Sequence, residues 1–257
     1  MIRPTGIINF AVGEWAMVGA FGGYLVLAKV SWPYPLGFVA VLAFMFVVGW
    51  ATERISVRPL LEKGAPLLAP ILALLGMLVV FRESISLIFG PDPYQVPEPL
   101  GFEYQSYFII GVTAAVFVGT WLFFERTVWG KAFEAVAIHR RAAALMGINL
   151  SRVTALSFGA GGVVAGLAGL LVGPNISAHY LMGVPLAIQG FTALVIGGVG
   201  RVEGALLGGL LLAFAEQLTV RYAPIPAGYA QGVPLVFLLV FLVFRPTGLL
   251  RAREAKA

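Results

Sequence analysis

Residues 125–152 read ERTVWGKAFEAVAIHRRAAALMGINLSR and interrupt a chain that is otherwise strongly hydrophobic. Charged side chains recur along this stretch, yet apolar residues such as Phe133 and Val136 keep roughly helical spacing. Hydrophobic segments flank it at 106–124 and 151–173. The pattern predicts a charged amphipathic helix between two membrane spans, a form suited to binding a soluble partner.

The composition is that of a membrane protein. Of the 257 residues, 60% are hydrophobic and 11% are charged, and the mean hydropathy is +0.93. Soluble domains average about 45–50% apolar and about 25% charged residues. Most of the hydrophobic segments approach the roughly 20 residues that a helix needs to cross a bilayer, although 185–200 is short. The eight segments are 9–29, 35–52, 66–83, 106–124, 151–173, 185–200, 203–221 and 228–244.

We therefore expect an all-α fold, a polytopic transmembrane helical bundle of about eight segments with one cytoplasmic helix. The whole chain, 1–257, is expected to form a single membrane domain, because no soluble stretch is long enough to fold alone.

Several kinds of chemistry are excluded. Cysteine is absent, which removes disulfides and thiolate metal sites. Two isolated histidines, His139 and His179, cannot make a dedicated zinc site, and no HExxH sequence occurs. Neither a GxGxxG dinucleotide loop nor a GxxxxGK[ST] nucleotide loop is present. We expect no metal, no bound cofactor and no ATP hydrolysis by this route in the chain itself.

Basic residues predict the orientation. With a cytoplasmic N-terminus, only Lys29, Arg82 and Arg221 of the 17 lysine and arginine residues fall outside, so the other 14 fall inside. Cytoplasmic loops of membrane proteins carry such an excess. Both termini and residues 125–152 are therefore expected in the cytoplasm. Because this orientation accounts for the net charge of +5, we expect no nucleic-acid partner.

Glycine recurs at four-residue spacing in two runs, GAGGVVAGLAG at 159–169 and GGVGRVEGALLGG at 197–209. Small residues at this spacing let membrane helices approach closely, so both runs predict close helix packing. The turn around Arg201 and Glu203 has two interpretations. It is either a helix interruption near a substrate path or a tight cytoplasmic hairpin with solvated charges.

A few polar residues lie within the apolar segments. Glu14 and Asn9 are near the start of the first segment, and Gln189 and Glu216 lie in later ones. Intramembrane acids are costly and usually functional, but Glu14 and Glu216 also lie close enough to segment ends to sit at the membrane interface. A pathway role, an interfacial position and helix pairing all stay open for these residues.

Five blocks in order along the chain resemble the permease subunits of the branched-chain amino acid class of ATP-binding-cassette importers. Together the blocks cover nearly the full chain, and their order is more specific than any one of them. Val12 stands where that family usually has histidine, so no role for an imidazole carries over. The blocks are INFAVGEWAMVGA (8–20), IFGPDPYQVPEP (88–99), GKAFEAVAIHRRAAALMGIN (130–149), FTALVIGGVGRVEGALLGGLLLAFAE (191–216) and FRPTGLL (244–250).

The family usually has roughly one further hydrophobic helix before the first block, whereas Met1 here lies eight residues before Asn9. Three explanations stay open: a gene start set too late, a truncated protein and a true absence of that helix.

The resemblance implies that 125–152 is a coupling segment whose helix docks into a groove on a separate ATPase subunit. Glu134 near the helix start suits the helix dipole, and Gly147 can end the helix, with Asn149 as an alternative cap. A helix that only binds anionic lipid is the other interpretation. The candidate docking residues are Lys131, Glu134, Ala135, His139, Arg140, Arg141, Ala144 and Gly147.

The implied assembly pairs this chain with a second permease subunit, as a heterodimer, and with two ATP-binding subunits that hold ATP and Mg. A periplasmic or lipid-anchored binding protein would deliver substrate, and the complex would lie in the inner (plasma) membrane of a prokaryote. Candidate residues of the translocation pathway are Asn9, Gly13, Glu14, Gln189, Gly197, Gly198 and Gly200.

The substrates that this resemblance implies are leucine, isoleucine or valine, but a small, apolar pathway is equally compatible with urea or short amides. An ion-driven secondary transporter is a second class, and it predicts paired charges at the membrane midplane. An intramembrane enzyme is a third, with Ser177 and His179 as its candidate nucleophile and base.

Overall fold

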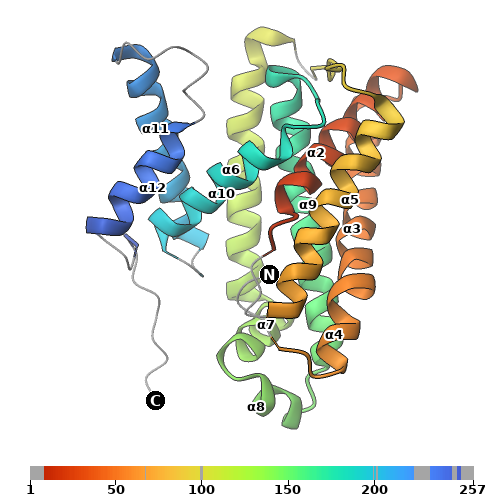
Figure 1. Ribbon diagram of the computed structural model, residues 1–257, viewed down its shortest axis with the longest axis vertical. Coiled ribbons are helices and arrows are strands. Elements are labelled where there is room, and N and C mark those ends of the chain that lie inside the picture. Colours follow the sequence, from red (N-terminus) through yellow and green to blue (C-terminus); the bar gives the residue numbers. More distant parts are fainter. Residues whose placement is uncertain are drawn as a thin grey trace. The chain divides into compact units, whose positions relative to one another are not determined.

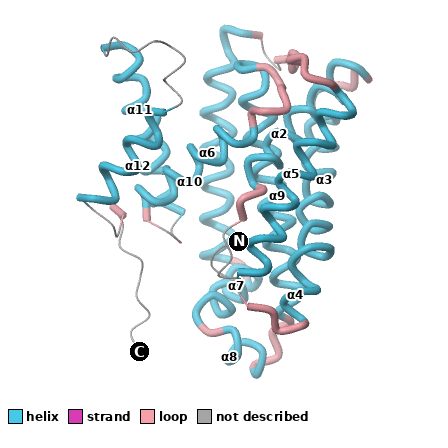
Figure 2. The backbone as a smooth tube through the Cα atoms, viewed as in Figure 1, coloured by secondary structure: helices cyan, strands magenta, loops and turns pink. Residues whose placement is uncertain are grey.

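A computed structural model describes residues 9–66, 68–98, 101–198, 200, 202–222, 232–244 and 248–249, apart from the side chains of Phe102, Arg141, Val220, Val233 and Leu242. Most of these residues are helical, and among them there is no strand beyond an isolated bridge between Tyr94 and Ala178 (Figure 2). The prediction of an all-α bundle is confirmed.

The helices follow one another with short connections (Figure 1). Two of them continue into π-helical turns, η1 (Tyr24–Lys29) after α2 and η2 (Glu53–Val57) after α3. The α-helices are α2 (Val12–Gly23), α3 (Tyr34–Thr52), α4 (Arg58–Glu62), α5 (Leu68–Phe89), α6 (Phe102–Arg126), α7 (Val128–Ile138), α8 (Arg140–Leu145), α9 (Leu150–Ile176), α10 (Gly183–Gly197), α11 (Val202–Tyr222) and α12 (Val233–Phe244).

Five helices of the described residues are long and apolar enough to cross a membrane. α10 is apolar but has only 15 residues, or about 22 Å at 1.5 Å per residue, as the short segment at 185–200 predicts. Segment 9–29 appears as α2 with η1, and α12 covers 233–244 of the last segment. The five are Tyr34–Glu62, Leu68–Phe89, Glu103–Arg126, Leu150–Ile176 and Val202–Thr219.

The end of the third segment was wrongly placed. The sequence interpretation ended this span at residue 83 and put Arg82 outside, whereas α5 continues to Phe89 and contains both Arg82 and Glu83. The helix can hold Arg82 because its guanidinium pairs with Glu14 of α2.

The chain divides into two compact units between Val184 and Pro185. In the first unit, α9 packs against both α2 and α3. Glycine makes these contacts close: a Cβ at Gly169 would collide with the backbone of Ala16, and one at Gly162 would collide with the carbonyl oxygen of Met45. A Cβ at Gly19 would likewise collide with the backbone of Gly166. The close packing predicted from 159–169 is confirmed.

The end of the first unit opposite α7 and α8 is closed by an ordered loop, residues 90–98 (Figure 1). Tyr94 and Ala178 exchange two backbone hydrogen bonds of 2.8 and 2.7 Å. The side chain of Gln95 donates to the carbonyl oxygen of Pro174 at 3.0 Å and accepts from Ser177 at 2.7 Å. The loop is thereby fixed to the end of α9.

In the second unit, α10 and α11 form a tight hairpin. A Cβ at Gly197 would collide with the backbone of Gly204, and one at Gly208 would collide with the carbonyl oxygen of Ala193. The close packing predicted from 197–209 is therefore also confirmed. α12 packs against α11.

Glycine packing along α9 can be tested by adding one methyl group. We expect Gly169→Ala to destabilise the protein by about 1–3 kcal/mol, because overpacking a close contact costs about that much. The thermal midpoint of the detergent-solubilised protein should fall by roughly 2–4 °C per kcal/mol. Gly119→Ala on α6 is the matched control, since a Cβ there meets open space. Equal midpoints for both variants would contradict the packing argument.

Candidate functional site

The predicted cytoplasmic segment begins with a sharp reversal after α6. Thr127 has extended backbone and caps α7, its Oγ1 accepting from the amide of Gly130 at 2.9 Å and donating to the carbonyl of Phe123 at 2.6 Å. Gly130 lies against the backbone of Phe123 and Phe124, where a Cβ would collide. α7 therefore folds back closely on the end of α6.

The inner face of the segment is a small apolar core. Phe133 and Val136 of α7, Ala143 of α8 and Val153 of α9 are buried together. The Phe133 ring also meets the ring of Phe124 edge-on, with centroids 6.3 Å apart. The apolar residues of the predicted amphipathic pattern thus pack α7 and α8 against the start of α9.

The segment consists of two helices, which corrects the prediction of one. His139 has extended backbone (φ −151°, ψ 97°), so it ends α7. Its Nδ1 accepts from the amide of Ala142 at 3.1 Å and thereby caps α8. A candidate docking residue therefore separates the two helices.

Gly147 ends α8, as predicted. It adopts φ +83°, and the amides of Gly147 and Ile148 donate back to the carbonyls of Ala144 and Ala143. This is the hydrogen-bonding pattern of a glycine cap. Asn149 does not cap this helix; its side chain accepts from the amide of Arg152 at 3.0 Å and caps the start of α9.

The charged face is exposed and loosely paired. Lys131 lies 3.7 Å from Glu134 and 4.0 Å from Glu125, and all three side chains are about half exposed, so these pairs contribute little to stability. Glu134 sits in the middle of α7, since the helix begins at Val128; its predicted role at the helix start is therefore wrong.

The other candidate docking residues lie on the same two helices. Ala135 and Arg140 are half-buried, while His139, Ala144 and Gly147 are exposed. The side chain of Arg141 lies outside the described part of the structure.

Exposed apolar side chains accompany the charged face. Leu145 is 89% exposed, Val128 86% and Met146 72%. Trp129 is also exposed and lines a shallow cavity of about 250 Å³ beside Arg152 at the start of α9. Large apolar side chains on short helices outside the five spans indicate a contact surface for another molecule.

Three of the pathway candidates lie together at the start of α2. Asn9 is buried, and its Oδ1 accepts from the amide of Ala11 at 3.0 Å, turning the chain into the helix that carries Gly13 and Glu14. Glu14 is 1% exposed, so its carboxyl group is enclosed by protein atoms. Its Oε1 accepts from Arg82 Nη2 at 3.0 Å.

The remaining pathway candidates lie in the second unit. Gln189 donates to Glu216 at 3.3 Å, pairing α10 with α11. Gly197 ends α10, and Gly198 and Gly200 adopt φ +100° and +92° in the turn that follows. Arg201 lies outside the described residues, and Glu203 begins α11.

Ser177 and His179 do not form a nucleophile–base pair in the described structure. The Ser177 hydroxyl donates to Gln95 at 2.7 Å, and His179 Nδ1 contacts the carbonyl oxygen of Ser177 at 3.3 Å. This geometry gives no support to the hydrolase interpretation.

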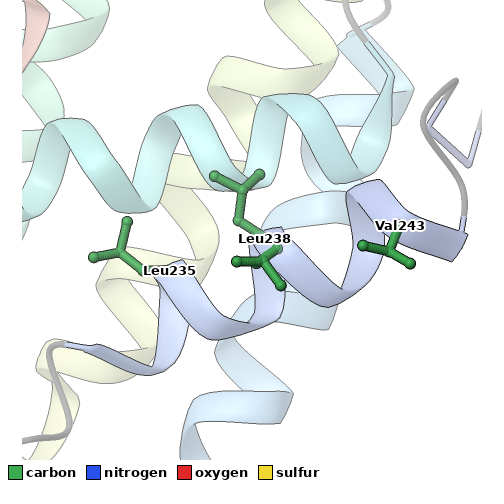
Figure 3. Close-up of a pocket in the computed structure, with 4 residues that line it drawn as sticks. Leu235, Leu238 and Val243 are labelled. Atoms are coloured by element: carbon green, nitrogen blue, oxygen red, sulfur yellow. The ribbon is translucent and has the colours of Figure 1, made fainter.

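A groove of about 490 Å³ runs along α12 and is lined by Leu235, Leu238, Leu239 and Val243 (Figure 3). Its lining offers no polar group to orient a polar substrate.

Sequence reasoning missed Arg82 as a partner of Glu14 and Glu53 as a second buried acid, in the π-helical turn after α3. The apolar residues that resume at Ile85 and reach Phe89 were the signal that the helix continues past Arg82. No comparable sequence signal marks Glu53.

Comparison with known proteins gives a consistent result. A family model described as "Branched-chain amino acid transport system / permease component" matches residues 1–242. The high-affinity branched-chain amino acid transport system permease protein LivH of Escherichia coli (strain K12) is 29% identical, over 98% of this chain and 88% of its own length. The corresponding permease protein BraD of Pseudomonas aeruginosa is 30% identical with the same coverage.

The chain is also similar, more distantly, to a permease protein that is named for a sugar. The ribose import permease protein RbsC of Escherichia coli (strain K12) is 27% identical over 84% of this chain and 70% of its own length. No solved structure matches the chain.

Proposed function

Because the chain belongs to the family of permease components of branched-chain amino acid transport systems, we propose that it is a membrane-spanning subunit of an ATP-driven importer of these amino acids. The family match over residues 1–242 carries this proposal. The five helices that are long and apolar enough to span a membrane support it.

The partners follow from the family, whose members are components of a larger transport system. ATP and Mg are held by two separate ATP-binding subunits. A second permease subunit completes the pathway, and an external binding protein delivers the substrate. The complex lies in the inner (plasma) membrane of a prokaryote, with both termini of this chain in the cytoplasm.

α7 and α8 are the contact with the ATP-binding subunits. Their outer face combines exposed Leu145, Met146 and Lys131 with the half-buried cation Arg140, whereas their inner face is packed on α9. Apolar anchors surrounded by charged residues are typical of protein interfaces.

An ion-driven transporter is the second candidate, because the buried pair of Glu14 and Arg82 is the paired charge that such a mechanism predicts. The family match favours the ATP-driven mechanism, whose partners are separate proteins.

The proposed function predicts ATP-dependent leucine uptake by a reconstituted complex. The chain should copurify with a second permease and two ATP-binding subunits, and vesicles that also receive the binding protein should accumulate radiolabelled L-leucine only with ATP. Vesicles lacking the ATP-binding subunits are the control. Leucine uptake driven by an ion gradient alone would contradict the proposal and support the ion-driven candidate.

The proposed docking surface predicts that Leu145→Asp and Arg140→Glu uncouple the complex. Burying the Leu145 side chain in the interface contributes about 1.5–3 kcal/mol. For Leu145→Asp, the amount of substrate L-leucine taken up per ATP hydrolysed should therefore fall about tenfold or more, with membrane insertion unchanged. Lys63→Glu, an exposed charge reversal in the α4–α5 turn, is the matched control. Normal coupled uptake by both docking variants would exclude this surface.

A further inference from the structure

The carboxyl group of Glu14 is buried inside the first unit. Glu14 lies in the first turn of α2. Its neighbours Trp15 and Ala16 pack against Phe158 and Gly169, which are well inside the 27-residue α9. The first turn of α2 therefore lies beside the middle part of α9, away from the two ends of that helix.

Arg82 donates a hydrogen bond to only one of the two oxygens of this carboxyl group. Arg82 Nη2 donates to Glu14 Oε1 at 3.0 Å, but Glu14 Oε2 and Arg82 Nε are buried with no hydrogen-bond partner. Arginine–carboxylate pairs are frequently bidentate, and a buried polar atom without a partner costs about 1–3 kcal/mol. Glu14 Oε2 is therefore an acceptor, and Arg82 Nε a donor, that a bound ligand can use.

The start of α10 also lies against the carboxyl group of Glu14. A Cβ at Gly183 would lie 2.6 Å from the Glu14 carboxyl carbon and 2.9 Å from Oε1. Only glycine allows the backbone this close to the carboxyl group. The first amides of a helix have no partner within the helix, and Pro185 has no amide hydrogen. The start of α10 therefore adds the amides of Gly183 and Val184 as donors near Glu14. The side chain of Arg82 is 24% exposed, which gives access to the site.

We infer that Glu14, Arg82 and the start of α10 form a binding site for the zwitterionic backbone of an α-amino acid. Glu14 Oε2 accepts from the α-ammonium group, while Arg82 and the first amides of α10 donate to the α-carboxylate. This inference rests on the proposed function and specifies how the membrane pathway recognises its substrate.

Charge balance supports this assignment. Without substrate, Glu14 and Arg82 neutralise one another, so the pair carries no net charge. A zwitterion carries one charge of each sign. Its ammonium group pairs with Glu14 and its carboxylate with Arg82, so the net charge of the site stays zero. An apolar pathway alone would leave both substrate charges unsolvated, at a high cost. Urea and short amides carry no such charges, so the site favours amino acids over these alternatives.

The alternative is that the pair only braces α2 against α5. A double variant separates the two roles, because removing both charges of a buried pair is often neutral for stability while removing one is costly. Glu14→Gln, Arg82→Gln and the double variant would be compared in the complete complex with its ATP-binding subunits. Glu53→Gln is the matched control, since Glu53 is equally buried and also has an oxygen without a partner.

The measurements are equilibrium binding of radiolabelled L-leucine to the complex in the absence of binding protein, ATP-driven leucine uptake, and the thermal midpoint. The double variant should keep complex assembly and a midpoint near that of the wild type. It should nevertheless bind leucine about tenfold or more weakly, because two charged hydrogen-bonding partners of the substrate are gone. Glu53→Gln should bind leucine as the wild type does.

Two leucine analogues test each charge in the wild-type complex. 4-Methylpentanoate lacks the α-ammonium group and 3-methylbutylamine lacks the α-carboxylate, so neither should compete at concentrations where unlabelled leucine does.

A double variant that binds and transports leucine normally would overturn the site and leave the pair as a brace, as would competition by either analogue equal to that of leucine. A wild-type complex that neither binds nor transports leucine would overturn the proposed function together with the site. The two failures are therefore distinguishable.

Discussion

The structure of the first unit depends on backbone contact between helices that lack side chains at the crossing. α9 meets α2 where Gly169 lies against Ala16, and it meets α3 where Gly162 lies against Met45. In a membrane the lipid is as apolar as the helix surface, so packing at short range must supply much of the attraction between helices. Any larger residue at these crossings would separate α9 from its neighbours.

This packing has consequences at both ends of α9. At one end the apolar core of Phe133, Val136 and Ala143 holds α7 and α8 on the helix, and at the other Gln95 and Tyr94 fix the loop of residues 90–98. It also positions α2 so that Glu14 faces Arg82 inside the unit. On the proposed function, a displacement of α7 and α8 by the ATP-binding subunits is therefore a displacement of α9.

Much of this organisation is predictable from the sequence, because it rests on periodic patterns. Glycine at four-residue spacing predicts the close helix contacts, and the apolar spacing around Phe133 predicts a helix with one inner face. Gly147 ends α8 as its residue type suggests.

The features that escaped prediction depend on single contacts between distant residues or on local backbone geometry. Arg82 lies within α5 because Glu14, 68 residues away, compensates its charge, and hydropathy along one segment cannot register that partner. The break between α7 and α8 depends on the extended backbone of His139 and on its ring accepting from Ala142. Histidine is not among the preferred helix caps, so its residue type gives no warning.

The central claim is that the exposed face of α7 and α8 meets an ATP-binding subunit. The most direct test places a photo-crosslinking amino acid at Leu145 in the complete complex and identifies the captured product by mass spectrometry. Val118 on α6, exposed within a predicted span, is the comparison position. The account predicts that position 145 captures the ATP-binding subunit and that position 118 does not. Capture of lipid alone at position 145 would contradict it.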